Sequence, residues 1–489
     1  MTQLQDRDLL SVQEVRNLVA KAKEAQKRLA SMSQGKIDEL VAAVAEAACR
    51  HAERLGRMAQ EETGFGKPED KTLKNLFAAK SVYESIKDLR TVGIVREDTK
   101  NRMFEVAVPV GVIAGLIPST NPTSTAIYKA MVALKAGNGI VFSPHPSAKG
   151  CILETIRVLS EAVCAAGGPE GIFGCMTIVT LEGTEELMHS KDVALILATG
   201  GSGMVRAAYS SGTPAIGVGP GNTPAFIERS ADIPQAVRRI ISSKTFDYST
   251  ICASEQSVVA ESCIESVVRA EFEKQGAYFL PPEDAAKVAR AIFTPSGGMN
   301  PRTVGKSPKF IAEKAGVAIP EGTKLLLADG MGVGKEYPFS HEKLCPALAF
   351  YSADGWEKCC ELCIELLAFE GAGHTLAIHS SNDEVIREFG LKKPVSRVVV
   401  NAGSSLGAVG ATTHLVPSMT LGCGAVGHNA TSDNVGPLHL LNIRRVAWGV
   451  REIEDLRPAK QAGPAMLNGD QLDRLVERIV EELAGKLKL

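Results

Sequence analysis

Residues 104–143 read FEVAVPVGVIAGLIPSTNPTSTAIYKAMVALKAGNGIVFS, and this stretch decides the fold. Its first part, 104–117, has the β-branched and apolar composition that is typical of strands. A helix is predicted over 124–135, because a glycine follows shortly after that segment. The short apolar run 139–143 predicts a second, buried strand. A strand, a helix and another strand in this order indicate a parallel sheet with helices on both faces.

Strand and helix patterns alternate along most of the chain. Residues 10–90 predict helices, because apolar residues recur there at helical spacing, and residues 151–166 predict another helix. The short apolar runs 176–180 and 193–198 predict buried strands. After about residue 226 the alternation restarts. A chain of 489 residues is longer than one ordinary domain, so we expect at least two lobes, each with its own core.

The composition excludes several classes of protein. A formal net charge of −2, without a cluster of Lys and Arg, argues against nucleic acid as a partner. No apolar run approaches the roughly 20 residues that span a bilayer. The polar N-terminus lacks the apolar core of a signal peptide. The 11 cysteines lack metal-ligand spacing, so we expect buried thiols, no metal, no membrane contact and a reducing cytoplasm.

Cys252 is the residue that points most directly to a chemistry. It lies just before an apolar, strand-like run and downstream of two glycine-rich turns, ATGGSG (198–203) and GVGPGNTP (217–224). A further turn, IPSTNP (117–122), lies upstream. From about residue 20 to residue 450 this order of motifs resembles the aldehyde dehydrogenase superfamily. The resemblance is to its coenzyme-A-acylating branch, which includes acetaldehyde and propionaldehyde dehydrogenases, half of the bifunctional aldehyde-alcohol dehydrogenases, and enzymes of bacterial microcompartments.

The resemblance implies an architecture as well as a chemistry. Two Rossmann-like α/β lobes and a dimerising β-arm are expected, and the protein is expected to be a homodimer or homotetramer. The implied segments are a cofactor-binding domain over 1–225 with an oligomerisation hairpin near 94–107, a catalytic domain over 226–435 and an oligomerisation strand over 436–455.

In this family a cysteine oxidises the aldehyde, and Cys252 is the matching residue. A thiolate adds to the carbonyl, the thiohemiacetal loses hydride, and a thioester remains that is still activated for acyl transfer. We therefore expect an elevated thiolate fraction at Cys252. The resemblance gives Asn121 the role of holding the developing oxyanion, together with the backbone N–H of the cysteine. The alternative for Asn121 is a turn cap before Pro122.

The resemblance also implies that NAD and coenzyme A bind in one cleft. The glycine-rich turn 198–203 precedes a predicted helix, and backbone N–H groups at a helix start attract phosphate. A tight strand-to-helix turn is the alternative explanation for these glycines. Glu342 matches the carboxylate that holds the nicotinamide ribose, and a surface charge is its alternative. His374 is a candidate for proton transfer from coenzyme A, since its ordinary pKa is near 6.5; a structural histidine is the alternative. The expected cofactor-binding residues are Pro118, Ser143, Thr199, Gly200, Gly201, Ser202, Gly219, Gly221 and Glu342.

One absence distinguishes the branches of the family. Hydrolytic members carry a Glu in a Glu-Leu-Gly-Gly-Lys type segment, and this Glu activates the water that cleaves the thioester. The matching position here is Val218, and no residue from Gly217 to Phe226 is a carboxylate. Water attack should therefore be slow, which leaves the acyl group to coenzyme A.

The predicted reaction is the oxidation of a short aldehyde by NAD and coenzyme A to acyl-CoA and NADH. A hydrolytic dehydrogenase that releases the free acid, a sulfoacetaldehyde-specific acylating enzyme and a shell-associated pseudoenzyme are the alternatives. Neither the aldehyde, the preference for NAD over NADP nor the base that deprotonates coenzyme A follows from the residues.

The C-terminal segment differs from the rest. Residues 456–469 contain the Pro and Gly typical of a linker, and residues 470–489 carry apolar residues at helical spacing with acidic residues early and Lys late. An amphipathic helix behind a linker predicts either packing on the enzyme itself or an encapsulation peptide that binds microcompartment shell proteins. The lumen of such a compartment is thus an alternative to the open cytoplasm.

Overall fold

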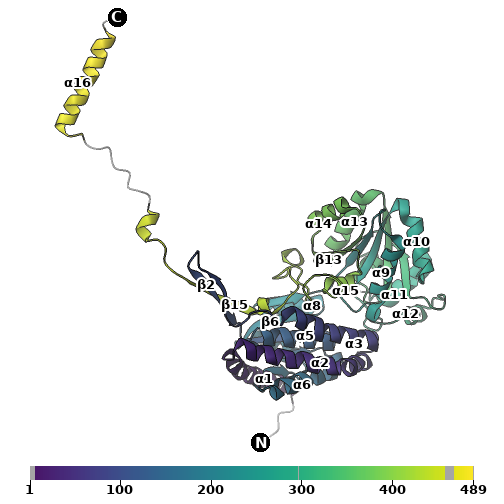
Figure 1. Ribbon diagram of the computed structural model, residues 1–489. Helices are drawn as coiled ribbons and strands as arrows, with labels where there is room; N and C mark the ends of the chain where they lie inside the picture. Colours follow the sequence, from purple (N-terminus) through teal and green to yellow (C-terminus); the bar gives the residue numbers. More distant parts are fainter. Residues whose placement is uncertain (1–5, 296, 458–466, 488–489) are drawn as a thin grey trace. The chain divides into compact units, whose positions relative to one another are not determined.

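The computed structural model describes residues 6–295, 297–457 and 467–487 (Figure 1). Helices come first, as the sequence predicts for residues 10–90. Helix α2 begins after Ser33, whose side chain accepts a hydrogen bond from the N–H of Lys36, and ends at Gly64, whose φ of 66° suits glycine. The N-terminal elements are α1 (Arg7–Ala30), α2 (Gln34–Thr63), α3 (Pro68–Leu76), a π-helical turn (Phe77–Ser81) and α4 (Val82–Ile86).

The first sheet has five parallel strands in the order β5-β4-β3-β6-β7. All residues of β3 and β4 are buried, which is typical of parallel strands covered on both faces. The parallel α/β architecture predicted from residues 104–143 is thus confirmed. The strands are β3 (Val112–Ile117), β4 (Gly139–Pro144), β5 (Phe173–Cys175), β6 (Val193–Thr199) and β7 (Ala215–Val218). The helices are α5 (Pro122–Lys135), α6 (Lys149–Ala165), α7 (Leu181–His189) and α8 (Ser202–Ser210).

The predicted strand over 176–180 is wrong. Strand β5 ends at Cys175, and residues 176–180 lead into α7, whose N-cap is Thr180. The side chain of Thr180 accepts a hydrogen bond from the N–H of Gly183. A three-residue strand that contains a glycine leaves too short an apolar pattern to be distinguished from the loop beside it.

The second sheet has seven parallel strands in the order β10-β11-β12-β9-β8-β13-β14. Its strands are β8 (Thr223–Ile227), β9 (Glu255–Glu261), β10 (Ala277–Phe279), β11 (Leu325–Asp329), β12 (Ala347–Ala353), β13 (Gly373–His379) and β14 (Val395–Val400). Its helices are α9 (Ile233–Thr245), α10 (Glu265–Lys274), α11 (Pro282–Ile292), α12 (Pro308–Ala315), α13 (Gly355–Phe369), α14 (Asp383–Lys392) and α15 (Ser404–Ala408). The cysteines 359, 360 and 363 are buried in α13, where they pack as small apolar side chains.

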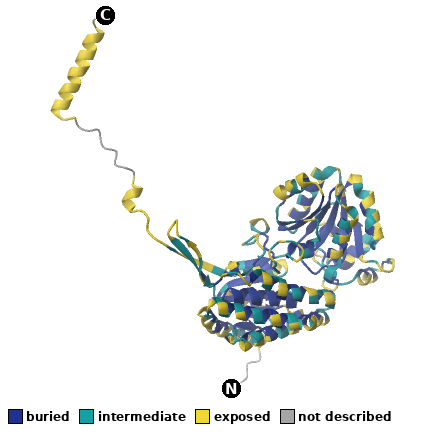
Figure 2. Ribbon diagram, in the orientation of Figure 1, coloured by how far each residue is buried: buried dark blue, intermediate teal, exposed yellow. Residues whose placement is uncertain are grey.

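The core of the first lobe has two apolar layers, one on each face of its sheet. Successive side chains of a strand point to opposite faces, so Ile113 and Ile117 of β3 join the layer that contains α2 and α5. Val112, Ala114 and Leu116 join the layer that contains α1 and α7. Every residue of β3 is buried, and Figure 2 shows buried residues in the interior of the lobe with exposed ones on its outside. Apolar side chains between residues 408 and 440 also belong to the first layer, so the chain returns to this lobe after the second sheet.

A three-stranded sheet of order β1-β2-β15 contains the predicted hairpin near 94–107. Its strands are β1 (Gly93–Asp98), β2 (Met103–Pro109) and β15 (Leu441–Ala447). Arg96–Glu105 and Arg445–Leu489 form a compact unit of their own. Within this unit Arg445 Nε lies 3.0 Å from Glu105 Oε1, and the rings of Phe104 and Trp448 are 5.8 Å apart.

The last helix, α16 (Gly469–Lys486), lies in the same unit. Its start is capped twice: the Asn468 side chain accepts from the N–H of Gln471, and the Gln471 side chain accepts from the N–H of Asn468. Residues 458–466 of the predicted linker, and residues 488 and 489 of the predicted helix, lie outside the described residues. The apolar stripe is exposed on Leu472, Leu475, Val476, Ile479, Val480, Leu483 and Leu487.

Candidate active site

A cavity of about 820 Å³ lies at the carboxyl ends of the strands of the first sheet. The residues Ile117, Ser143, Thr199 and Val218, each at or next to the end of one strand, line it. Crevices at this edge are the usual ligand sites of open parallel sheets. Its wall also includes Cys252, from the turn before β9. The cavity therefore brings together turns that lie far apart in the sequence.

Cys252 follows an unusual backbone segment. Asp247, Tyr248 and Ser249 have φ values of 47°, 49° and 68°, the left-handed region that residues with side chains rarely occupy. Such residues cost about 1–2 kcal/mol each, so surrounding contacts must hold them in place. The Asp247 carboxylate provides several: Oδ1 accepts from the N–H of Lys67 at 2.7 Å, and Oδ2 accepts from Lys71 Nζ at 3.0 Å.

The thiol of Cys252 is protonated at rest. Burial raises the pKa of this thiol to about 12, and the Glu342 carboxyl group adds to the shift, while Arg397 opposes it only in part. The expectation of an elevated thiolate fraction is therefore wrong for the free protein. The physical reason is that the thiol lies in poorly solvated surroundings, where the charged form is disfavoured.

Asn121 occupies the N-cap position of α5, yet its side chain makes no cap hydrogen bond with the described residues of that helix. Its Nδ2 instead donates to the carbonyl of Thr250 at 3.0 Å. Its Oδ1 accepts from Lys74 Nζ at 2.5 Å. The amide is thus directed towards the segment that carries Cys252, and it lines the cavity.

Lys74 is a site residue that the sequence did not reveal. It is 3% exposed, and its Nζ also contacts the Asp247 carboxylate and, at 3.1 Å, Thr250 Oγ1. Burial lowers the pKa of Lys74 to about 8, although the Asp247 charge opposes that shift. The burial pattern of α3 marks these lysines as unusual. Lys71 and Lys74 are buried while Leu73 is 54% exposed, which is the reverse of an ordinary surface helix. Pattern alone does not distinguish this arrangement from a solvated charged face.

Gly221 and His374 lie behind the cavity wall rather than on it, since neither is among the residues that line the cavity. A Cβ at Gly221 would be 2.3 Å from the Cys252 carbonyl oxygen and 3.2 Å from His374 Cγ. His374 Nδ1 lies 2.9 Å from Thr375 Oγ1, and Nε2 has no hydrogen-bond partner in the described structure. Burial, with Arg397 nearby, lowers the pKa of His374 to about 3. The expectation of an ordinary histidine pKa is wrong, so His374 is neutral at pH 7.

The cavity wall suits a ligand that carries phosphate. Helix α8 starts there, and its N-cap residue, Gly201, has no side chain that could cap the first backbone N–H groups of the helix. Thr199 Oγ1 is buried and has no hydrogen-bond partner among the residues that the structure describes. A Cβ at Gly201 or Gly219 would meet nothing within 4 Å, so both turns leave space. Open backbone N–H groups at a helix start favour anions.

Most of the predicted cofactor-binding residues lie on this wall. Glu342 is there, and its Oε1 accepts from the N–H of Gly221 at 3.1 Å. Burial is the main cause that raises the pKa of Glu342 to about 8, and the charge of the nearby Glu370 is the second cause. Ser202 is exposed in the first turn of α8 and is not among the lining residues. The predicted residues that line the cavity are Pro118, Ser143, Thr199, Gly200, Gly201, Gly219 and Glu342.

The cavity wall carries a single carboxylate among its described residues, and that carboxylate is Glu342. Val218, at the position where a hydrolytic family member would carry Glu, is 2% exposed and lines the cavity with its apolar side chain. No lysine or arginine belongs to the described lining.

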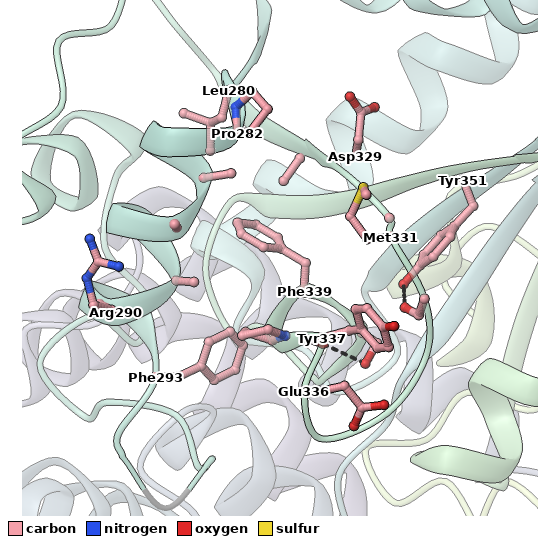
Figure 3. A pocket seen from close by; sticks show the side chains of 18 of the residues that line it. Leu280, Pro282, Arg290, Phe293, Asp329, Met331, Glu336, Tyr337, Phe339 and Tyr351 are labelled. Carbon is pink, nitrogen blue, oxygen red and sulfur yellow. Dashed lines mark hydrogen bonds between the residues drawn. The ribbon is translucent and has the colours of Figure 1, made fainter.

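A second cavity, of about 900 Å³, lies between α11 and the loop after β11 (Figure 3). Its described lining includes Phe293, Met331, Tyr337 and Tyr351 but neither cysteine nor histidine. Across the described ranges, no cluster of His, Cys, Asp and Glu could hold a metal ion. The helices in those ranges are too short or too polar to cross a membrane. The cavity with Cys252 therefore carries the candidate chemistry.

Known proteins share both the sequence and the fold. The chain is 56% identical to an acetylating aldehyde dehydrogenase from Geobacillus thermoglucosidasius, with a TM-score of 0.91 over 94% of this chain and 100% of that chain. It is 42% identical over 89% of its length to a bifunctional aldehyde-alcohol dehydrogenase of Escherichia coli, of which it covers 50%. The chain thus spans about half the length of the first curated relatives that it matches.

Further relatives are similar over nearly their whole length. A succinate-semialdehyde dehydrogenase (acetylating) of Clostridium kluyveri is 39% identical over 90% of this chain and 96% of its own. A propionaldehyde dehydrogenase of a Clostridium phytofermentans microcompartment is 30% identical, with a TM-score of 0.82 over 89% of this chain and 97% of that one.

A Rhodopseudomonas palustris propionaldehyde dehydrogenase was solved with bound CoA and an acylated cysteine. It is 27% identical, with a TM-score of 0.81 over 89% of this chain and 97% of that one. The sequence profile of the aldehyde dehydrogenase family matches residues 3–278. On these similarities, the chain belongs to the aldehyde dehydrogenase family.

Proposed function

We propose that the chain is a coenzyme-A-acylating aldehyde dehydrogenase that converts an aldehyde, NAD⁺ and coenzyme A into acyl-CoA, NADH and a proton. One observation carries the proposal: Cys252 and the Asn121 amide share a cavity whose wall has Val218 where a hydrolytic enzyme needs a carboxylate. We assign residues 1–225 to cofactor binding and 226–435 to the catalytic cysteine.

Cys252 would carry the acyl group. Its Sγ bonds to the aldehyde carbon as the thiol proton passes to solvent, which is the proton released in the overall reaction, and the Asn121 Nδ2–H donates to the oxygen that gains negative charge. When bound, NAD⁺ would supply the acceptor for the hydride of this carbon, and Cys252 would then hold the acyl group as a thioester. The thiol of coenzyme A then takes the acyl group and returns Cys252 Sγ to its starting state. The open start of α8 and the Thr199 hydroxyl would hold the phosphates of these co-substrates.

The experiment that tests the proposal omits coenzyme A. With aldehyde and NAD⁺ alone, we expect about one NADH per site followed by a stall, because Val218 stands where a hydrolytic enzyme has the carboxylate that activates water. Addition of coenzyme A should restore turnover. Sustained release of free acid, at a rate similar to that of the coenzyme A reaction, would instead establish the hydrolytic alternative. No NADH with any short aldehyde would favour a pseudoenzyme.

The substrate that fits the cavity is a short, uncharged aldehyde such as acetaldehyde or propionaldehyde. The described lining of the cavity includes the apolar side chains of Phe65, Met299, Val304 and Met419, and it includes no lysine or arginine. A carboxylate or sulfonate on the substrate would lose hydration without gaining a counter-charge. Sulfoacetaldehyde is therefore the weaker alternative.

The arm suggests an oligomer. In the unit of residues 96–105 and 445–489, Trp448 is 48% exposed and Val450 and Ile453 are about two-thirds exposed. We propose that this unit contributes to a homodimer or homotetramer. Light scattering should give at least twice the 51.8 kDa of the chain, and deletion of residues 445–489 should reduce that mass. A wild-type monomer would refute the assignment.

For α16 we propose docking to a microcompartment shell protein by the helix-in-groove mode, because its apolar stripe is covered by nothing in the described part of its unit. A fluorescent protein fused to residues 456–489 should form foci when it is co-expressed with shell proteins. Diffuse fluorescence, with the truncated enzyme still co-purifying with shells, would reject this partner.

A further inference from the structure

We propose that Lys74 is a positioning residue, which holds the Asn121 amide with one N–H directed at the oxygen of the bound aldehyde. The inference rests on the proposed function. An ammonium group has three donors and no acceptor, so its contact of 2.5 Å identifies Oδ1 as the end of the amide that faces Lys74. The nitrogen end then faces the segment of Cys252.

The hydrogen bonds of Nδ2 leave one donor for a ligand. One of its two hydrogens is engaged by the carbonyl of Thr250 at 3.0 Å. The other has only a long contact, 3.3 Å, with Thr120 Oγ1. Since Asn121 lines the cavity, this second hydrogen is available to a substrate oxygen. A rotated amide would present an oxygen there and would repel the oxyanion.

Lys74 itself cannot move easily. Its three donors are matched by three acceptors, namely Asn121 Oδ1, the Asp247 carboxylate and Thr250 Oγ1. Asp247 begins the left-handed segment that leads to Cys252. Lys67 and Lys71 also bind the Asp247 carboxylate and so support the backbone before Cys252, whereas Lys74 holds the Asn121 amide. Lys74 also polarises the amide, which strengthens the remaining N–H as a donor.

Lys71 provides a matched control. It is buried on the same helix, and its Nζ donates to Asp247 Oδ2 at 3.0 Å and to the carbonyl of Thr120 at 3.1 Å, but among the hydrogen bonds of the described residues none joins it to the Asn121 side chain. Lys71→Met removes a buried cation beside Asp247 while the contact between Lys74 and Asn121 stays. Lys74→Met removes that contact and leaves Asp247 paired with Lys71.

The test is a double-mutant cycle on the rate of NADH formation with acetaldehyde, NAD⁺ and coenzyme A. We expect Lys74→Met to lower kcat about 10-fold to 100-fold, and Lys74→Met with Asn121→Ala to be no slower than Asn121→Ala alone. Lys71→Met should cost much less in kcat. The rate of Cys252 alkylation by iodoacetamide should be unchanged in Lys74→Met, which a general disturbance of the site would not allow.

Three results would overturn the inference: effects that multiply in the double variant, an equal loss in Lys71→Met, or alkylation that falls in parallel with kcat. If Lys74→Met does not fold, Lys74→Gln replaces it in the cycle, since the Gln amide retains an N–H donor. Losses in kcat that multiply in the double variant with Asn121→Ala would again overturn the inference. A wild-type protein without any aldehyde oxidation would instead refute the proposed function, so the two failures are distinguishable.

Discussion

The thiol of Cys252 illustrates how much a single residue depends on its surroundings. Burial raises the pKa of Cys252 to about 12, and Glu342 contributes to that shift. Glu342 is itself shifted, to a pKa of about 8, by burial and by Glu370. At pH 7 the carboxyl group is therefore mostly neutral and the cysteine is a thiol. We therefore expect slow alkylation of the free protein at this pH, and the thiol must lose its proton when it reacts with the aldehyde.

This coupling predicts a pH dependence. In the free protein, the rate of Cys252 alkylation by iodoacetamide should rise from pH 7 to 10, because only the thiolate reacts. The rise should be less than tenfold per pH unit near pH 8, where ionisation of Glu342 raises the thiol pKa. Glu342→Gln should leave the rate at pH 6.5 nearly unchanged and increase it above pH 8, where the lost negative charge had raised the thiol pKa. Mass spectrometry of the alkylated peptide measures both rates. An equal effect of the substitution at both pH values would contradict the coupling.

The identity of the nucleophile is tested directly. Cys252→Ala should abolish both NADH and acyl-CoA formation, because the thioester precedes both products. Cys164→Ala, which alters an exposed thiol outside the cavity, should leave both rates unchanged. NADH formation by Cys252→Ala above a few per cent of the wild-type rate would remove Cys252 from the mechanism.

Among the elements, the connection between β7 and β8 sets how closely the two sheets approach the nucleophile. Gly221 belongs to this connection, and its backbone N–H binds Glu342. A methyl group there would be 2.3 Å from the carbonyl oxygen of Cys252, a distance that real Cβ atoms do not adopt. The glycine is required by close packing, since its φ lies outside the left-handed region.

Gly221→Ala should therefore lower both stability and turnover. The backbone must shift away from Cys252, and overpacking of this kind costs about 1–3 kcal/mol. Thermal denaturation should show a lower Tm, whereas Gly219→Ala, whose Cβ meets nothing within 4 Å, should leave the Tm unchanged. A Gly221→Ala protein with wild-type Tm and kcat would mean that the loop is farther from Cys252 than described.

At the scale of the whole molecule, the charge of the cavity predicts substrate preference. Acetaldehyde and propionaldehyde should give kcat/KM values at least about tenfold above those of succinate semialdehyde and sulfoacetaldehyde, since a desolvated anion without a partner costs more than 1.4 kcal/mol. A panel of the four aldehydes with NAD⁺ and coenzyme A measures this ratio. Equal or reversed values would contradict the preference for an uncharged aldehyde.

The sequence alone determined the α/β class, the parallel strands around residues 104–143 and the family. It did so because strand and helix periodicity and the order of turns are local properties of the chain. It also identified Cys252, Asn121 and Glu342, which the structure places on one cavity wall. It misplaced the strand at β5, where three residues are too few for a pattern.

Only the tertiary structure decided the state and the support of these side chains. The protonated thiol of Cys252 and the low pKa of His374 arise from burial, which depends on elements distant in sequence. The contact of Lys74 with Asn121 joins residues 47 positions apart on two helices, and that with Asp247 spans 173 positions. Local patterns do not distinguish buried lysines from solvated ones, because burial of a charge becomes favourable only when its partners come from elsewhere in the fold.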